Sequence, residues 1–167
     1  MEQDYNQDCS FAKDKNRFRY RAAAIIIEND CVLLASNETV DYFYSIGGAV
    51  HLGETAEKAV VREVIEETGV QYEIERLAFV HENFFTDDIG FFNGIDCHEV
   101  AFYFLMKQRG TKKLNSNSYC MDGKEFMNWM PISELKNHKI YPIFFAEKLA
   151  KLAKQVEHIV TIEDTNE

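Results

Sequence analysis

Three carboxylates stand close together in a stretch that the sequence predicts to be helical: Glu63, Glu66 and Glu67. At 100° per residue, Glu66 and Glu67 each lie within about 60° of Glu63, so the three side chains share one arc of the helix. Like charges at these spacings repel, and a divalent cation removes the repulsion. Mg²⁺ prefers carboxylate oxygens and commonly bridges them to substrate phosphates. The spacing indicates a magnesium site, although a solvated acidic helix face has the same composition.

The helix that carries these acids is predicted over residues 55–68, and Gly69 ends it because glycine tolerates the positive φ of a helix C-terminus. A second arc of this helix is apolar and is expected to face the core; it consists of Val60, Val61, Val64 and Ile65. Ala56 and Ala59 are small, and they let a glycine-containing loop, residues 47–53, come close to the acids. The helix and the loop are therefore expected to position the site together.

A fixed pattern of residues surrounds the acids. Its members are Gly48, Glu54, the triplet Arg62-Glu63-Val64, the pair Glu66-Glu67, Gly69 and the aliphatic Val70. Every position matches the Nudix box, and the chain resembles the Nudix hydrolase superfamily, which includes MutT-like enzymes and ADP-ribose pyrophosphatases. Ile46 departs from the pattern, since many members have proline before the glycine pair, and this difference is expected to alter the stiffness of the loop.

The resemblance implies both a fold and a reaction. The implied fold class is α/β (α+β), a Nudix-type α/β/α sandwich with a mixed β-sheet. The implied reaction is hydrolysis of a nucleoside diphosphate linked to another moiety, with ADP-ribose-like compounds favoured. One alternative is a MutT-like pyrophosphatase that removes unwanted nucleoside triphosphates. A ligand sensor without turnover is a further alternative, and the intact Glu63, Glu66 and Glu67 argue against it.

The resemblance also assigns roles to residues of the box. The implied ligands of Mg²⁺ or Mn²⁺ are Glu63, Glu66, Glu67 and the carbonyl of Gly48. Arg62 matches an arginine that orients the neighbouring glutamate, and its guanidinium could also bind a phosphate through two nitrogens. Glu54 matches a residue that ties the loop to the helix. Gly48, Glu54 and Gly69 are the structural positions of the box.

The expected mechanism follows from the charge of a pyrophosphate, which repels hydroxide. Bound cations must neutralise the phosphates and lower the pKa of a water, and a carboxylate then removes the proton of that water. Glu63 is the first candidate for this base, as the box position that some family members use. Glu99 is the second candidate, because family members often supply a further acid from this region.

Candidates outside the box are isolated side chains. His51, Glu82 and Phe84 are expected to contact the substrate, with strand-end solvation or packing as the alternative for each. Several aromatic residues could stack on a base, because any aromatic face accepts one, although core packing would explain them equally well. These residues are Tyr42, Tyr44, Phe84, Phe91 and Phe92.

Composition limits the classes of partner. The chain has 18 basic and 28 acidic residues, a formal net charge of −10, which argues against general nucleic-acid binding. No apolar run is long enough to cross a membrane, and no secretory signal is recognised. The four cysteines are scattered without a CxxC pair, as in a cytoplasmic protein with reduced thiols. The expected partner is a nucleoside-diphosphate-type small molecule, and family analogy adds a possible homodimer.

The sequence predicts a single Nudix domain over residues 17–160, preceded by a flexible N-terminal arm, residues 1–16. Strands are expected over residues 18–27, 31–36, 42–46, 72–85, 98–108 and 126–130. Residues 142–157 are amphipathic and start with proline, and they predict a second helix. These elements give a mixed sheet covered by helices.

Overall fold

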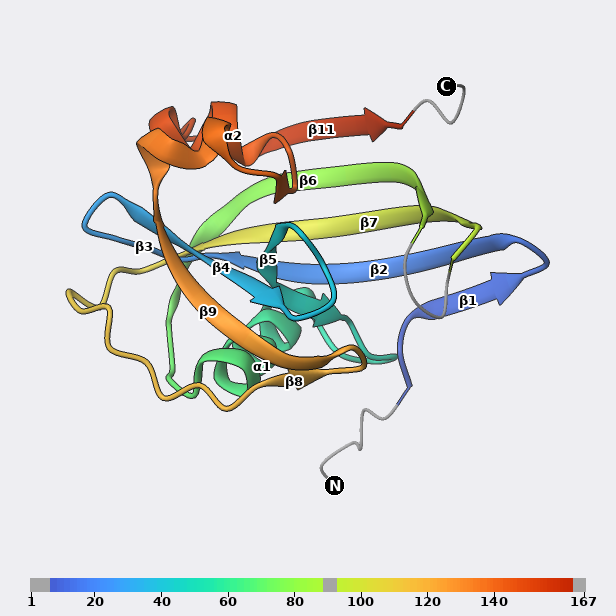
Figure 1. Ribbon diagram of the computed structural model, residues 1–167, viewed down its shortest axis with the longest axis horizontal. Helices are drawn as coiled ribbons and strands as arrows, with labels where there is room; N and C mark the ends of the chain where they lie inside the picture. The colour runs from blue at the N-terminus through green and yellow to red at the C-terminus, as the bar shows by residue number, and fades with distance from the viewer. Residues whose placement is uncertain (1–6, 89–92, 164–167) are drawn as a thin grey trace.

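The structure, a computed structural model, describes residues 7–88 and 93–163 (Figure 1). In this part of the chain eleven strands form one mixed sheet with the order β11-β6-β7-β2-β5-β4-β9-β8. These strands are β11 Glu157–Ile162, β6 Ile74–Asp87, β7 Ile95–Met106, β2 Asn16–Ile25, β5 Phe43–Ala49, β4 Cys31–Asn37, β9 Gly123–Pro131 and β8 Tyr119–Cys120. Three short strands pair at the side of this path: β1 Ser10–Lys13 with β2, β3 Ile27–Glu28 with β4, and β10 Ile140–Tyr141 with β5.

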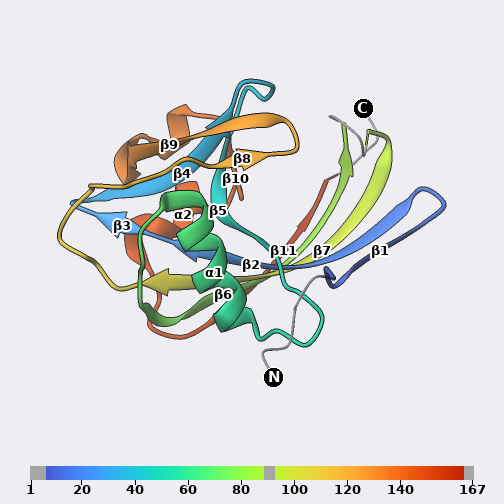
Figure 2. The ribbon, with the colours of Figure 1, turned by 90° about the horizontal axis from the view of Figure 1, so that it is seen from below.

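The sheet is mixed because its central strand β2 has neighbours of both directions. It runs parallel to β7 and antiparallel to β5. Beyond β7, strand β6 is antiparallel and the edge strand β11 is parallel to β6. Figure 2 shows β1, β2, β6 and β7 curving as they extend past the helix α1.

Helix α1, Ala56–Thr68, confirms the predicted helix and its end. Thr55 caps the N-terminus by accepting a hydrogen bond from the Lys58 N–H at 3.3 Å, and Gly69 follows the last turn with φ 70°. Val60 and Val64 are fully buried as expected, whereas Ile65 is 44% exposed. The buried stripe consists instead of Val60, Val64 and Glu67, which are four and three residues apart. This is the spacing of one helix face.

Helices cover both faces of the sheet, as in the predicted α/β/α sandwich (Figures 1 and 2). Successive residues of β2 point to opposite faces. Ala22 and Ala24 pack on the side of α1. Ala23 and Ile25 pack on the other side, against a layer that includes helix α2, Phe145–Lys148. The 3₁₀ segments η2, Ile132–Asn137, and η3, Leu149–Lys151, complete this second layer. Within the described residues, no helix is long and apolar enough to cross a membrane.

The expected second helix over residues 142–157 is wrong in its length. Only the short α2 and η3 are helical, and the helical conformation ends at Leu152, five residues before β11 begins. In β11 the half-buried and exposed residues alternate, and Ile159, Val160 and Ile162 are β-branched. Such residues favour a strand with one packed face, which was not predicted from the sequence here.

The expected N-terminal arm is also wrong over part of its length. Ser10–Lys13 forms β1 and pairs with Asn16–Arg19 of β2. Just before it, the Cys9 N–H donates to the Val50 carbonyl at 2.8 Å. Backbone hydrogen bonds to the neighbouring strand order this segment, although it buries little apolar surface.

Candidate functional site

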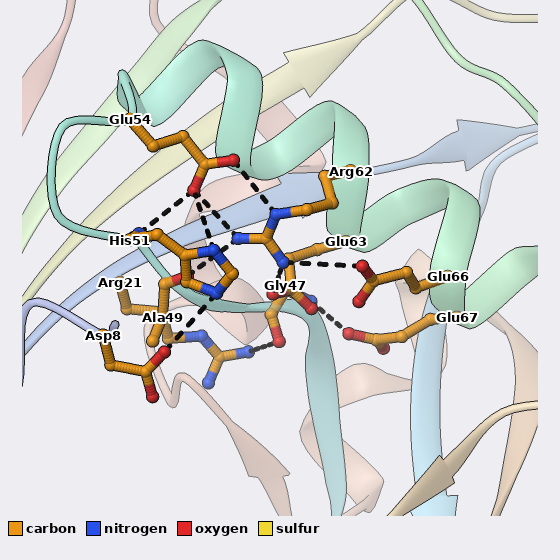
Figure 3. Close-up of polar contacts among 10 residues, drawn as sticks. All are labelled: Asp8, Arg21, Gly47, Ala49, His51, Glu54, Arg62, Glu63, Glu66 and Glu67. Carbon is orange, nitrogen blue, oxygen red and sulfur yellow. Dashed lines mark hydrogen bonds and ion pairs between the residues drawn. The ribbon is translucent and has the colours of Figure 1, made fainter. Parts of the chain in front are cut away.

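Arg62 joins the start of the Nudix-like box to its acids (Figure 3). Its Nε and Nη2 donate to the two carboxylate oxygens of Glu54, each at 3.0 Å, and Nη2 also donates to the Ala49 carbonyl at 3.0 Å. Its Nη1 donates to Glu63 Oε1 at 2.5 Å and lies 3.7 Å from Glu66 Oε1. Burial alone would raise the pKa of Glu54, but the hydrogen bonds from Arg62 and the His51 N–H outweigh it, so this pKa is lowered. Arg62 therefore orients Glu63 and ties β5 and the following loop to α1.

Glu67 has unmet hydrogen-bonding capacity inside the protein. Its side chain is on the buried stripe of α1, and the residue is 6% exposed. Oε1 accepts a hydrogen bond from the Gly47 N–H at 2.9 Å, whereas Oε2 is buried without a partner among the described residues. Burial raises the pKa of Glu67 to about 8, and the nearby Glu125 adds to this. Burial also raises the pKa of Glu63, although Arg62 opposes the shift.

Gly47 and Gly48 belong to β5, not to a loop as the sequence suggests. Ile46 lies within the same strand opposite Ala24, so this part of the chain is regular. A Cβ on Gly48 would lie 2.5 Å from Glu63 Oε1 and 2.6 Å from its Cδ. Gly48 therefore lets the backbone of β5 pass directly against the carboxylate of Glu63.

The oxygen donors of this region fit a divalent cation. Glu67 offers a buried carboxylate oxygen without a partner, and hard carboxylate oxygens are what Mg²⁺ and Mn²⁺ prefer. In the described residues no three His, Cys, Asp or Glu side chains yet converge on one point. Arg62 explains this, because its Nη1 contacts both Glu63 and Glu66 and balances their charge.

The acids open into a cleft of about 730 Å³, which Glu63, Glu66 and Glu67 line together with Glu99 of β7. Glu99 forms an ion pair with Arg19: both Nε, at 2.5 Å, and Nη2 of Arg19 contact its Oε2. Burial would raise the pKa of Glu99, but Arg19 and Arg21 outweigh it and lower the pKa. The structure thus places both candidate bases, Glu63 and Glu99, in one cleft, with their pKa values shifted in opposite directions.

Sequence reasoning missed the arginines of this cleft. Arg17, Arg19 and Arg21 are alternate residues of β2, and all three line the cleft. Arg21 Nη2 donates to the carbonyls of Ser45 at 2.8 Å and Gly47 at 3.3 Å. Alternate residues of a strand share a face, so the alternation of arginines and aromatic residues over 17–21 was the available signal.

A buried carboxylate on β9 was missed as well. Glu125 is 8% exposed, and its two oxygens accept hydrogen bonds from Tyr44 Oη at 2.5 Å and Ser118 Oγ at 2.8 Å. All three residues line the cleft. Burial and the bond to Glu125 raise the pKa of Tyr44, so its hydroxyl stays a donor. The sequence gives no spacing that would link these distant residues.

Three residues expected to contact the substrate do not line this cleft: His51, Glu82 and Phe84. His51 lies beside Arg62, where its Nε2 is 3.4 Å from Asp8 Oδ1 and its Nδ1 is 3.9 Å from Glu54 Oε2 (Figure 3). On β6, Glu82 contacts His158 at 3.0 Å and Phe84 stacks on His98. Odd-numbered neighbours on β6, such as Asn83, line the cleft, so strand alternation directs Glu82 and Phe84 to the other face.

The aromatic candidates for base stacking are divided. Tyr42 and Tyr44 line the cleft, where Tyr141 packs edge-on against Tyr42 with ring centroids 4.9 Å apart. Phe91 and Phe92 lie outside the described residues. Two tyrosines from β5 and its approach thus supply aromatic surface beside the acids.

The NUDIX domain family model matches residues 17–151. The chain is 37% identical to a MutT-like protein of Streptomyces ambofaciens over 62 residues, which are 36% of this chain and 40% of that relative's length.

Solved structures share the fold. A MutT protein of Bacillus halodurans matches with a TM-score of 0.63 and 17% identity over 87% of this chain and 92% of the other. An ADP-ribose pyrophosphatase of Streptococcus suis matches with a TM-score of 0.54 and 16% identity over 86% and 98% of the two chains. Because the family match covers most of the chain and includes the acids, Arg62 and Gly48, this protein belongs to the Nudix hydrolase family.

Proposed function

We propose that this Nudix hydrolase uses Mg²⁺ or Mn²⁺ to cleave the phosphoanhydride of a nucleoside diphosphate linked to another moiety, with ADP-ribose-like compounds favoured. The observation that carries the proposal is the unpartnered, buried oxygen of Glu67 beside Glu63 at one end of a cleft large enough for a nucleotide. A fixed carboxylate oxygen without a partner is costly unless a cation or a proton completes it. The fold likeness to an ADP-ribose pyrophosphatase supports the substrate class.

The cation site would consist of Glu63, Glu66 and Glu67, with the backbone of Gly48 beside them. These residues would hold Mg²⁺, which would supply positive charge against the phosphate oxygens and lower the pKa of a nearby water. Arg62 holds Glu63 in place and balances its charge through the contact at 2.5 Å. Gly47 holds Glu67 by one oxygen and leaves the other to the cation.

Glu63 is the base that the electrostatics favour. Burial raises its pKa, which makes its carboxylate a better proton acceptor than an ordinary glutamate. The pKa of Glu99 is lowered instead, chiefly because Arg19 and Arg21 outweigh its burial. Arg21 carries positive charge close to both Glu63 and Glu99 and would face the anionic substrate between them.

The nucleoside would lie at the aromatic side of the cleft. Tyr42, Tyr44 and Tyr141 line it, and Lys139 lies 5.5 Å from the ring centre of Tyr42. Aromatic faces bind bases by stacking, and this favours no particular base.

The test is turnover of a nucleotide panel by the purified full chain. ADP-ribose, ADP-glucose, ATP and dGTP are incubated with Mg²⁺ or with excess EDTA, and the products are separated by chromatography. We expect cleavage of the diphosphate esters with release of AMP, and no turnover in EDTA. Glu63→Gln should lower kcat by about 10²- to 10⁴-fold. Glu57→Gln is the matched control, because Glu57 is an exposed acid in the first turn of the same helix.

Three outcomes would contradict parts of the proposal. Undiminished turnover in EDTA would exclude a metal-dependent reaction. Preference for triphosphates with release of pyrophosphate would indicate the MutT-like alternative, to which the fold likeness to a MutT protein corresponds. Nucleotide binding without any turnover would indicate a sensor.

A further inference from the structure

A row of polar side chains crosses four strands on the face of the sheet that lines the cleft. Arg19 of β2 is in register with Glu99 of β7, and Glu99 is in register with Asn83 of β6. Asn83 is in turn in register with Thr161 of β11. All four residues line the cleft. Since neighbouring strands lie about 4.8 Å apart, the row spans roughly 14 Å, about twice the width of a sugar ring.

The row mixes hydrogen-bond donors and acceptors. Glu99 is 4% exposed, and both contacts from Arg19 reach its Oε2. His81, two residues before Asn83 on β6, is 2% exposed, and its Nε2 lies 2.9 Å from Thr161 Oγ1. Its Nδ1 is buried without a partner in the described part of the chain. The carboxylate of Glu99, the amide of Asn83 and the hydroxyl of Thr161 all line the cleft and give this face of the sheet hydrogen-bonding groups for a ligand.

The row lies at a fixed offset from the acids of α1. Arg21 is two residues from Arg19 on β2, which places the two side chains about 7 Å apart on one face. Arg21 contacts the Gly47 carbonyl at 3.3 Å, and the Gly47 N–H donates to Glu67. The row is therefore one pleat further along the cleft than the place proposed for the phosphoanhydride.

We propose that this row is a subsite for a polyhydroxylated group, a sugar, on the substrate. The inference rests on the proposed function and names the moiety attached to the diphosphate. A hydroxyl is both donor and acceptor, so vicinal hydroxyls can use Glu99 and Asn83 together. A phosphate in the same place would face the carboxylate of Glu99. The tyrosines offer a base a surface for stacking elsewhere in the cleft, which leaves the row to another part of the substrate.

Glu99 then determines specificity and is not the proton acceptor of the reaction. Arg19 holds one of its oxygens and keeps the carboxylate ionised, and the other oxygen is directed to substrate hydroxyls. A specificity residue and a base give different kinetics. Loss of the first raises KM for sugar-linked substrates, and loss of the second lowers kcat for every substrate.

The experiment compares two substrates that share the base and the phosphoanhydride: ADP-ribose and the methyl ester of ADP, which has no second sugar. Both are assayed with Mg²⁺ on the unmodified chain, Glu99→Gln and Asn83→Ala. For Glu99→Gln we expect KM for ADP-ribose to rise about 10- to 100-fold, the effect of losing a hydrogen bond to a charged group. KM for methyl-ADP should stay within about threefold, and so should kcat for both substrates. Asn83→Ala should shift the same KM in the same direction by a smaller factor.

Glu157→Gln is the matched control, because Glu157 is also a partly buried, ion-paired glutamate of the same sheet and does not line the cleft. It should leave both KM values unchanged. Thermal unfolding of each variant shows whether it is folded, and Asn83→Ala decides the outcome if Glu99→Gln does not fold.

Each contrary result has a distinct meaning. A fall of kcat for both substrates makes Glu99 the base and overturns the subsite, as does an equal change of KM for both. If the unmodified chain cleaves neither substrate, the proposed function fails. Titration calorimetry in EDTA then tests the subsite alone: tighter binding of ADP-ribose than of methyl-ADP, lost in Glu99→Gln, supports it, and equal binding overturns it.

Discussion

Glu67 shows how a single residue can belong to the core and to the site. It continues the buried stripe of α1 after Val60 and Val64, so helix periodicity carries its side chain inward. The Gly47 N–H fixes one oxygen and the other is left without a partner. Glu66, on the same arc, is 58% exposed at its side chain. The two acids should therefore respond differently to substitution.

We expect Glu67→Gln to weaken the enzyme more than Glu66→Gln at limiting Mg²⁺. The loss should be at least the ~10- to 100-fold that follows from changing even a second-sphere partner of a metal. Excess Mg²⁺ or Mn²⁺ should restore part of the activity in both variants, because the missing charge lowers cation affinity. Initial rates across a metal titration measure this. Equal activity of both variants and the unmodified chain at low metal would contradict the site.

The Arg19–Glu99 pair makes a pH-dependent contribution to stability. Because the folded-state pKa of Glu99 is lowered, ionised Glu99 stabilises the fold above its unfolded pKa, and this is lost as pH falls through the folded pKa. Arg19→Gln leaves a buried carboxylate without its main partner. We expect a loss of about 3 kcal/mol of unfolding free energy at pH 7.

The loss in Arg19→Gln should shrink as pH is lowered toward 4, since the variant's Glu99 becomes protonated and no longer needs a cation. Urea unfolding at several pH values measures it, and the double variant Arg19→Gln/Glu99→Gln should recover most of the stability at pH 7. A deficit that does not change with pH would mean that the pair contributes packing alone.

Strand β5 brings its backbone against the acids of α1, and its two adjacent glycines have different structural roles. Gly47 has φ +144°, and a Cβ there would lie 2.6 Å from the Ala23 Cα of β2. Gly48 has no such backbone requirement, and the three atoms nearest to a Cβ there would all belong to the side chain of Glu63. A backbone obstacle cannot move away, whereas a carboxylate can rotate.

We therefore expect Gly47→Ala and Gly48→Ala to fail in different ways. Gly47→Ala should lower the unfolding free energy by about 2–4 kcal/mol through strain and overpacking. Gly48→Ala should keep its melting temperature nearly unchanged and lose activity, because Glu63 is displaced. Melting temperatures and kcat of the two variants, measured side by side, check this. Parallel loss of stability and activity in Gly48→Ala would show that its role is structural.

Elements that form through local interactions could be predicted from the sequence, whereas elements that depend on partners far away in the sequence could not. Helix α1 and its end at Gly69 follow from local spacing, so the sequence sufficed for them and for the shared arc of acids. β11 depends on pairing with β6, about 75 residues away in sequence. The local pattern therefore did not predict a strand there. The row from Arg19 to Thr161 likewise exists only through register across four strands.

The cleft brings charges of both signs together, although the net charge of the chain is −10. The acids of α1 and three arginines of β2 all line it. The sequence predicts the acids, because they are close together in one motif. It does not predict the opposing arginines as partners of that motif, since only the fold brings β2 and α1 to the same cleft.

The last strand is part of this assembly even though the family match ends at residue 151. β11 pairs with β6 over Glu157–Ile162, packs Ile159 against the core and contributes Thr161 to the cleft. We expect a chain ending at Gln155 to unfold at a lower temperature and to associate, because β6 would become a long exposed edge strand. Its KM for ADP-ribose should also rise relative to methyl-ADP, since the polar row loses Thr161. Thermal unfolding, size-exclusion chromatography and the two-substrate assay test this. A monomer with unchanged melting temperature and substrate preference would show that residues 17–151 are sufficient and that β11 has no share in the site.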